Sequence, residues 1–281
     1  MPSQITVRQT KTTDRDAIAY LSDFEFFVHQ HLDWRPPNEW LGHPSFQVAE
    51  YENEIIACLS APNEVNDVAW VRLFACSALY AKEKIFNVLL KTVLSLYPPS
   101  VKKVCSLGLH SWFIDLLKHN SFSTQQNIII FEWSENEVKE LDHNPGILIQ
   151  KVEFIDLPAI VELDQRCFPS IWQVPMNSMV EAFSQAGYFT KAVYNEKIVG
   201  YQLSTDSQSS AHLARLAVDP IIQGKKIGRS LVQDLQRHYL ALEINSISVN
   251  TQDDNFSSQA LYRKMGFQLL EEKYPVYVLE N

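Results

Sequence analysis

The residues best suited to chemistry lie in one segment of the C-terminal half that reads as strand, turn and helix. An apolar run ends at Val218, Asp219-Pro220 breaks it, and residues 223–228 (QGKKIG) open an amphipathic stretch. Amides in a first helical turn have no intrahelical acceptor, and the helix dipole places partial positive charge there. Glycines let a ligand approach the backbone closely. The segment therefore predicts a binding site for a phosphate or diphosphate group.

Two other kinds of phosphate loop do not fit this segment. A P-loop requires GxxxxGK followed by Ser or Thr, and that pattern is absent. The dinucleotide-binding fingerprint GxGxxG is also absent. Two glycines by themselves equally indicate an ordinary helix start, so the interpretation depends on the wider context.

A second motif follows downstream, at residues 255–267 (NFSSQALYRKMGF). Asn255 is suited to cap a helix and Gly266 to end it. Ser258 and Tyr262 are four residues apart and therefore share one helical face. A tyrosine in an isolated Leu-Tyr pair is more often a core residue. Combined with the upstream turn, a functional role for Tyr262 is the better interpretation.

Together the two motifs resemble the acyl-CoA-binding signature of the GNAT superfamily of N-acyltransferases. Gln223 and Gly228 match the first and last positions of Q/R-x-x-G-x-G/A, and residues 255–267 resemble the family block N-x-x-[AS]-x-x-L-Y-x-x-x-G-F. Lys226 stands where the family usually has its middle glycine, so the backbone φ there decides whether a lysine is strained. The resemblance extends over residues 147–280.

The resemblance implies an α/β (α+β) fold and direct transfer of an acetyl group from acetyl-CoA, the cosubstrate, to a primary amine in a ternary complex, with no metal. Tyr262 matches the acid that protonates the leaving thiolate. The implied acyl-CoA-binding residues are Leu216, Ala217, Val218, Gln223, Gly224, Lys225, Lys226, Ile227, Gly228, Arg229, Asn255, Ser258 and Tyr262.

The resemblance does not identify the general base. Some relatives carry a glutamate at the position that reads here as Ser210. His212 is the nearest substitute, because its ordinary pKa is close to neutral pH, although a half-exposed structural histidine is the more usual reading. Glu181 and Asp253 are further carboxylates without specific support.

The acceptor side of the site is implied by the same resemblance to lie in residues 166–186. The Cys-Phe-Pro sequence from Cys167 and nearby Trp172 are similar to enzymes that acetylate protein N-termini, although Cys167 and Phe168 are more often plain core residues. The acceptor is therefore a small amine or a protein N-terminus, and the sequence does not choose between them.

The elements that position these residues occur twice. Hairpins are predicted at 46–59 and 189–202, followed by strands at 68–76 and 211–218 and helices at 81–97 and 224–242. Equivalent residues are 143 apart early in each half and 145 apart later, which a two-residue loop insertion explains. This register predicts a duplication, with two tandem GNAT-like domains at 1–138 and 146–281 and a polar linker at 133–145.

The N-terminal copy lacks the residues that would bind phosphate. At an offset of 143, Lys226 maps to Glu83 and Gly228 to Ile85, and at an offset of 145 Tyr262 maps to Leu117. A carboxylate at a helix start repels phosphate. We therefore expect the first domain to be a degenerate copy without acyl-CoA binding.

Composition sets weaker bounds on function. A net charge of −9 argues against nucleic acid as a general partner, and no apolar run is long enough to predict a membrane span. Four scattered cysteines indicate free thiols and a cytoplasmic protein. His29, His31 and His43 are too irregularly spaced for a metal site and are predicted to lie in a surface loop. A non-catalytic acyl-CoA sensor or scaffold, another acyl donor or acceptor, and a homodimer all stay open.

Overall fold

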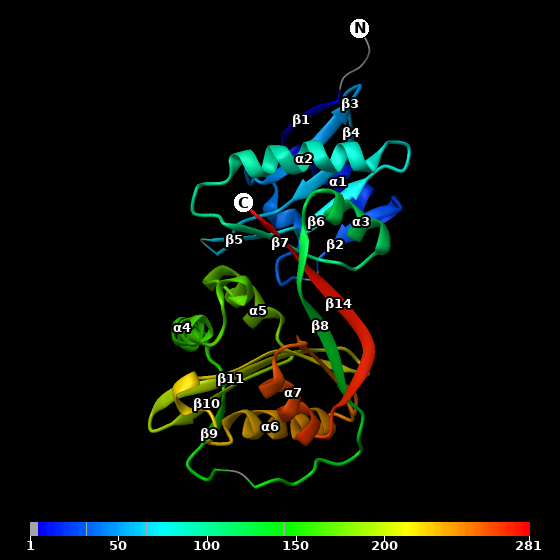
Figure 1. Cartoon of the computed structure of the whole chain (residues 1–281). Helices are drawn as coiled ribbons and strands as arrows, with labels where there is room; N and C mark the ends of the chain where they lie inside the picture. Colours follow the sequence, from blue (N-terminus) through cyan, green and yellow to red (C-terminus); the bar gives the residue numbers. More distant parts are fainter. Residues whose placement is uncertain (1–4, 32, 66, 143) are drawn as a thin grey trace. The chain divides into compact units, whose positions relative to one another are not determined.

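The computed structural model of the chain describes residues 5–31, 33–65, 67–142 and 144–281. Chain contacts divide it into two compact units: Met1–Gln125 with Tyr274–Asn281, and Gln126–Lys273. Each unit has a mostly antiparallel arrangement of strands flanked by helices (Figure 1). The predicted α/β (α+β) fold, with two units that each have a sheet and flanking helices, is confirmed.

In the N-terminal unit, five strands are ordered β1-β3-β4-β6-β2, and β5 and β14 flank β7. Alternating residues of the central strands fill two cores, because successive side chains point to opposite faces: Leu59 and Phe74 pack with α2, and Cys58 and Leu73 pack with α1. The elements are β1 (Thr6–Gln9), α1 (Arg15–Phe24), β2 (Phe27–Gln30), β3 (Phe46–Tyr51), β4 (Glu54–Ser60), β5 (Val68–Trp70), β6 (Leu73–Cys76), α2 (Lys82–Leu96), β7 (Lys103–Leu107) and α3 (Ser111–His119).

In the C-terminal unit, the strand order is β8-β13-β12-β11-β10-β9, and α4 and α5 lie on the opposite face of the sheet from α6 and α7 (Figure 1). Among the described residues of this unit, β12 and β13 run parallel, and the other neighbouring strand pairs run antiparallel. The elements are β8 (Ser123–Trp133), β9 (Leu148–Lys151), α4 (Leu157–Cys167), α5 (Met176–Gln185), β10 (Tyr188–Tyr194), β11 (Lys197–Asp206), β12 (Ala211–Val218), α6 (Ile227–Ala241), β13 (Ile247–Gln252), α7 (Phe256–Lys264) and β14 (Gln268–Glu280).

The two predicted hairpins match in detail. Both turn residues have positive φ in each hairpin, Glu52 and Asn53 in the first and Asn195 and Glu196 in the second, as tight hairpin turns require. Each first strand also changes register at the equivalent step, after Ala49 in β3 and after Ala192 in β10. Because β-bulges are specific local features, a shared bulge supports a common origin of the two halves.

Two sequence-based boundaries differ from the structure. The strand predicted at 68–76 is divided into β5 and β6, because the chain changes its pairing partner at Val71 and Arg72. Helices α2 and α6 each contain 15 residues and are already offset by 145 (82 to 227). The two-residue insertion therefore lies in the turn before α6, and Glu83 corresponds to Gly228 instead of Lys226.

The two units exchange strands. Residues 128–133 of β8 pair with β13 in the C-terminal unit, and residues 276–280 of β14 pair with β7 in the N-terminal unit. Both crossings between the units thus lie inside strands (Figure 1), whereas the sequence placed the boundary in the linker at 133–145. A polar linker marks where two sequence copies join, but strand pairing decides which residues form a compact unit.

Candidate functional site

Strands β12 and β13 separate after a short parallel pairing, which covers only Ala211 to Leu213 of β12. Strand β11 pairs with β12 along its whole length, and the amide of Asp219 donates to the carbonyl of Val199 at 2.9 Å. In this antiparallel register the N–H and C=O groups of Leu216 and Val218 point away from β11, while those of Ala217 point towards it. An extended ligand could therefore bond to Leu216 and Val218, and the backbone of Ala217 belongs to the sheet.

The turn after β12 presents unpaired amides. Gly224 has φ +83°, Lys226 has φ +67°, and α6 begins at Ile227. Within the described part of the chain, no amide from Gln223 to Arg229 has a hydrogen-bond acceptor. A Cβ placed on Gly224 would meet no heavy atom within 4 Å, so the turn is open at this point. These features suit an anion.

Lys226 adopts the left-handed conformation that a glycine would take without strain. For an L-residue with a side chain this conformation costs roughly 1–2 kcal/mol. The Lys226 ammonium pairs with the carboxylate of Asp142, and Arg229 Nη1 donates to the carbonyl of Asp142 at 2.9 Å. Lys225 lies over the ring of Tyr194, 4.7 Å from its centroid. Three cations therefore surround the turn, and two of them already contact Asp142.

Close packing holds the start of α6 against its neighbours. A Cβ on Gly228 would lie 3.2 Å from Leu261 of α7, and one on Gly200 of β11 would lie 3.0 Å from Ile227. Glycine at these two positions therefore lets α6 approach both β11 and α7, which brings the turn next to Val218.

Tyr262 lies in the core beneath α7. Asn255 caps this helix by accepting the amide of Ser258 at 3.1 Å, as the sequence predicted. The Tyr262 ring lies 5.9 Å from that of Phe131 and 5.7 Å from that of Phe267, and the residue is 4% exposed. Burial raises the pKa of Tyr262 far above its ordinary value, so its hydroxyl stays protonated at neutral pH. A protonated hydroxyl can serve as an acid.

His212 is held by its neighbour on β13. Its Nδ1 lies 2.8 Å from Ser248 Oγ, and Ser248 Oγ in turn donates to the carbonyl of Ala211 at 3.5 Å. This arrangement assigns the imidazole proton to Nδ1 and leaves Nε2 as an acceptor. Burial lowers the pKa of His212, which keeps the ring neutral at physiological pH. The ring is therefore in the state that a base requires.

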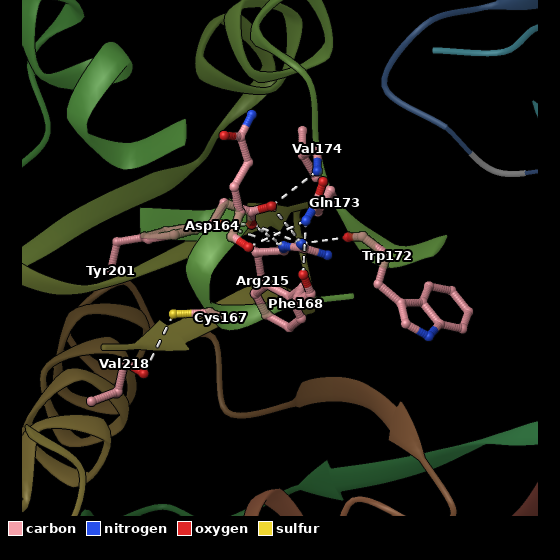
Figure 2. Close-up of polar contacts among 10 residues, drawn as sticks. Asp164, Cys167, Phe168, Trp172, Gln173, Val174, Tyr201, Arg215 and Val218 are labelled. Carbon is pink, nitrogen blue, oxygen red and sulfur yellow. Dashed lines mark hydrogen bonds and ion pairs between the residues drawn. The ribbon is translucent and has the colours of Figure 1, made fainter. Parts of the chain in front are cut away.

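A buried ionic cluster that the sequence did not reveal joins β12 to α4 (Figure 2). Arg215 Nε and Nη2 donate to the two oxygens of Asp164 at 2.8 and 2.9 Å, and the Tyr201 hydroxyl donates to the same carboxylate. Asp164 also accepts the amide of Val174 at 2.9 Å. Arg72-Leu73 in the first half recurs 143 residues later as Arg215-Leu216, which was a sequence signal for Arg215, but nothing in the spacing pointed to Asp164.

The acceptor residues proposed from the sequence fall around this cluster. Arg215 lies over the ring of Phe168, 3.7 Å from its centroid, and Cys167 donates its thiol to the carbonyl of Val218 at 3.4 Å. The carbonyl of Trp172 faces Arg215, while its indole points away (Figure 2). Phe168 and Cys167 are thus next to β12, as the acceptor prediction requires.

The other candidate bases are placed less favourably. Asp253 accepts both the amide and the side chain of Asn127, at 3.0 and 2.7 Å, and these bonds lower its pKa. Ser210 is exposed in the turn before β12, where its hydroxyl bonds with Ser207. Glu181 lies on α5, where its carbonyl accepts the Ser184 hydroxyl at 2.8 Å. Asp253 is therefore engaged by Asn127, and the structure gives no support for Ser210 or Glu181 as the base.

In the N-terminal unit, the equivalent of the open β12 edge is filled. Strand β5 pairs in parallel with β7, and β6 continues as the counterpart of residues 216–219. The free side of β6 is taken by β2, with Phe27 opposite Cys76 and His29 opposite Phe74. The prediction of a surface loop at His29 is therefore wrong. This side chain is fully buried and stacks 3.9 Å from Phe113, and burial lowers its pKa to about 3.

The structure also bears on metal binding, on the cysteines and on membrane spans. Among the described residues, no cluster of His, Cys, Asp or Glu could hold a metal ion. All four cysteines are free, and Cys58, Cys76 and Cys105 are buried. None of the helices in the described ranges is long and apolar enough to cross a membrane.

Comparisons with known proteins agree with this geometry. The acetyltransferase (GNAT) family model matches residues 157–267. A mycothiol acetyltransferase of Saccharopolyspora erythraea is 24% identical over 147 residues, which are 47% of each protein. An uncharacterised N-acetyltransferase of Methanocaldococcus jannaschii is 25% identical over 124 residues, covering 43% of this chain and 78% of that protein. The chain thus spans about half the length of the first of these relatives.

The similarity of fold covers both units. A tandem GNAT protein from the clavulanic acid biosynthesis pathway matches with a TM-score of 0.64 at 12% identity, over 99% of this chain and 98% of that one. Residues 157–267 are thus similar to the acetyltransferase (GNAT) family, and the similarity of fold to a tandem GNAT protein extends over both units.

Proposed function

We propose that the C-terminal unit transfers the acetyl group of acetyl-CoA to a primary amine. The observation that carries the proposal is the set of unpaired amides from Gln223 to Arg229, directly after a strand edge where the backbone groups of Leu216 and the amide of Val218 pair with neither β11 nor β13. The pyrophosphate of CoA would bind the amides, where the dipole of α6 favours negative charge. The pantetheine arm would then follow the strand edge.

The reaction needs a proton acceptor and a proton donor. In the proposal, the neutral amine attacks the thioester carbonyl, the carbon–sulfur bond breaks, and the thiolate of CoA leaves. His212 Nε2 takes the proton that the amine loses, and the Tyr262 hydroxyl gives a proton to the thiolate. Burial lowers the pKa of the imidazole and raises the pKa of the phenol, so at neutral pH the first is unprotonated and the second protonated, as these two roles require.

The N-terminal unit has a different role in this proposal. Strand β2 pairs along β6 at the counterpart of the β12 edge, and the carboxylate of Glu83 lies in the first turn of α2, where it disfavours an anion. We therefore propose that it is a degenerate copy that binds no acyl-CoA. Free thiols and an acyl-CoA substrate are consistent with the cytoplasm as the site of action.

The proposal is tested by calorimetry of acetyl-CoA with the whole chain, followed by turnover assays on a panel of small amines and aminoacyl peptides. Binding with release of free CoA in the presence of an amine is expected. Replacing Tyr262 by Phe should lower kcat by about 10²–10⁴-fold and leave acetyl-CoA affinity within about twofold, because an acid acts on the transition state.

A second function, a non-catalytic acyl-CoA sensor, is favoured by one observation. Lys226 has a strained backbone, and its ammonium is already paired with Asp142. This pairing leaves less positive charge for the phosphates of CoA than an efficient enzyme would need. A sensor would bind acetyl-CoA, release no CoA with any amine, and be unaffected by Tyr262→Phe. A protein with no affinity for any CoA thioester would contradict both functions.

A further inference from the structure

The segment between α4 and α5, residues 168–174, is fixed at several points to a single buried pair. Asp164 is fully buried at the side of α4 that faces β12, and its carboxylate accepts the amide of Val174 at 2.9 Å. Arg215 fills the remaining positions of this carboxylate together with the Tyr201 hydroxyl. A bidentate arginine–carboxylate pair fixes direction as well as distance. The pair is therefore a rigid anchor for the end of the segment.

Arg215 also holds the middle of the segment. Its Nη2 donates to the carbonyl of Trp172 at 2.5 Å, and its guanidinium stacks on Phe168 (Figure 2). The planar fork of an arginine can make these contacts simultaneously, which a lysine cannot do. One side chain of β12 thus contacts the start and the middle of the segment, while its partner Asp164 holds the end.

The segment is also next to the strand edge that would bind the acyl donor. Arg215 directly precedes Leu216 on β12, and Cys167, at the end of α4, bonds to the carbonyl of Val218. Because the backbone groups of Leu216 and the amide of Val218 point away from β11, and β13 pairs only with residues 211–213 of β12, a pantetheine arm bound there would run beside this segment. The route of an incoming amine is therefore bounded by residues that Arg215 and Asp164 hold.

The N-terminal unit shows a different use of the equivalent arginine. Arg72 forms ion pairs with Asp33 at 3.0 Å and Glu64 at 2.9 Å, and the segment that precedes its hairpin runs as β2 along the edge of β6. In the C-terminal unit, among described residues, no strand pairs with the corresponding edge at 214–218. The same position in the fold thus keeps an arginine, but only in the second unit does it hold the segment away from the strand edge.

We propose that Arg215 and Asp164 are positioning residues that fix residues 168–174 as the acceptor-side wall of the acetyltransferase site. This inference rests on the proposed acetyl transfer. The pair acts through the segment that it orients and does not contact the reacting atoms. Disturbing it should therefore weaken productive binding of the amine and leave binding of acetyl-CoA to the turn before α6 largely unchanged.

The test uses Arg215→Lys in the whole chain, which keeps the positive charge but loses the fork. A control is Lys191→Met, because Lys191 forms an ion pair with Asp156, at 2.6 Å, elsewhere in the same unit. For each protein, three quantities are measured: the Kd of acetyl-CoA by calorimetry, the KM of the best amine from the panel, and hydrogen exchange of the amides at 168–174.

In Arg215→Lys, the amine KM is expected to rise roughly tenfold and exchange at 168–174 to accelerate, because small misplacements of a bound reactant have large effects. The acetyl-CoA Kd should stay within about twofold, and the control should change neither quantity. If Arg215→Lys does not fold, Gln173→Ala provides the same test. Gln173 Nε2 donates to the carbonyl of Phe168 at 2.9 Å. Losing this bond should loosen the segment without leaving the buried carboxylate of Asp164 unpaired.

An unchanged amine KM together with accelerated exchange would show that the pair is only structural, and would overturn the inference. An equal rise in the acetyl-CoA Kd would also overturn it. Failure of the proposed function itself is recognised separately, because the unmodified protein would then show no acetyl-CoA binding or no turnover with any amine.

Discussion

The thiol of Cys167 donates to the carbonyl of Val218 at 3.4 Å, and this contact joins the end of α4 to the end of β12. Val218 is the last residue of the strand, immediately before the turn that leads to α6. Cys167 is partly exposed, whereas the other three cysteines are buried. A single accessible thiol therefore reports on the strand edge where acetyl-CoA is proposed to bind.

Alkylation of Cys167 by iodoacetamide should be slow at neutral pH. Burial raises the pKa of this thiol to about 11, and only the thiolate reacts, so the rate should rise tenfold per pH unit between about pH 7 and 10. Saturating acetyl-CoA should slow the reaction further by covering Val218. Mass spectrometry of the intact protein measures both effects, and rapid labelling at pH 7 would contradict the placement of this thiol.

The pH profile of kcat should report on His212. The buried imidazole has a lowered pKa, so its neutral form persists below pH 6.5 and activity should fall only as the pH drops further. His212→Gln should reduce kcat by about 10²-fold or more and remove this acidic limb. Ser248→Ala is the matched control, since it keeps the imidazole but releases Nδ1, and a smaller loss is expected. An unaltered pH profile of kcat in His212→Gln would show that His212 is only a structural residue.

Replacing Lys226 by glycine should be tolerated. The left-handed backbone at φ +67° is unstrained for glycine, which removes about 1–2 kcal/mol of strain, partly offset by the flexibility of glycine in the unfolded chain. The free energy of unfolding should therefore rise slightly or stay unchanged. Lys226→Ala keeps the strain and loses the charge, so urea denaturation of the two variants separates backbone from electrostatic effects. Lower stability of the glycine variant would contradict this account.

The whole chain should bind one molecule of acetyl-CoA. Strand β2 pairs along β6, and Glu83 lies where α2 begins, so among the described residues we expect binding at the turn before α6. Calorimetry should give a stoichiometry near one. Replacing Gly228 by Trp is expected to abolish binding entirely, because even a Cβ at this position lies 3.2 Å from Leu261. Two equivalents in the unmodified protein would show that β2 leaves its strand partner.

Circular dichroism tests whether Gly228→Trp loses binding because it unfolds. Circular dichroism of Gly228→Trp should keep the signal of the N-terminal unit, in which no atom is changed. A second variant, Gly228→Ala, should fold and weaken binding without abolishing it, since Leu261 then needs to shift only slightly. Abolished binding in Gly228→Trp and weakened binding in Gly228→Ala, both with intact structure, are the expected outcomes.

The sequence predicted the local features of the site well, because they depend on neighbouring residues. The turn at Gln223 to Gly228, the cap at Asn255 and the two hairpins were all placed correctly. Each depends on glycine conformations or on short-range hydrogen bonds that residue types reveal directly. The helix boundaries at α2 and α6 differed by one to three residues, since helix ends depend on packing.

Features that depend on distant partners were missed. Asp164 and Arg215 are 51 residues apart, and no spacing rule predicts that they meet. Strand β2 was not predicted, because His29 and Gln30 give it a polar pattern and its pairing with β6 is tertiary. The exchange of β8 and β14 was invisible for the same reason. A pairing register is fixed by the whole sheet and not by either strand alone.

The exchange of strands has a consequence for how the protein is made. On the ribosome, β7 emerges early, but the residues that pair with it, 276–280, are translated only after the entire C-terminal unit. During most of synthesis, β7 therefore lacks its partner residues 276–280. Its unpaired edge must avoid aggregation until they are translated. A nascent chain of this topology depends on its C-terminal residues to finish the half that was translated first.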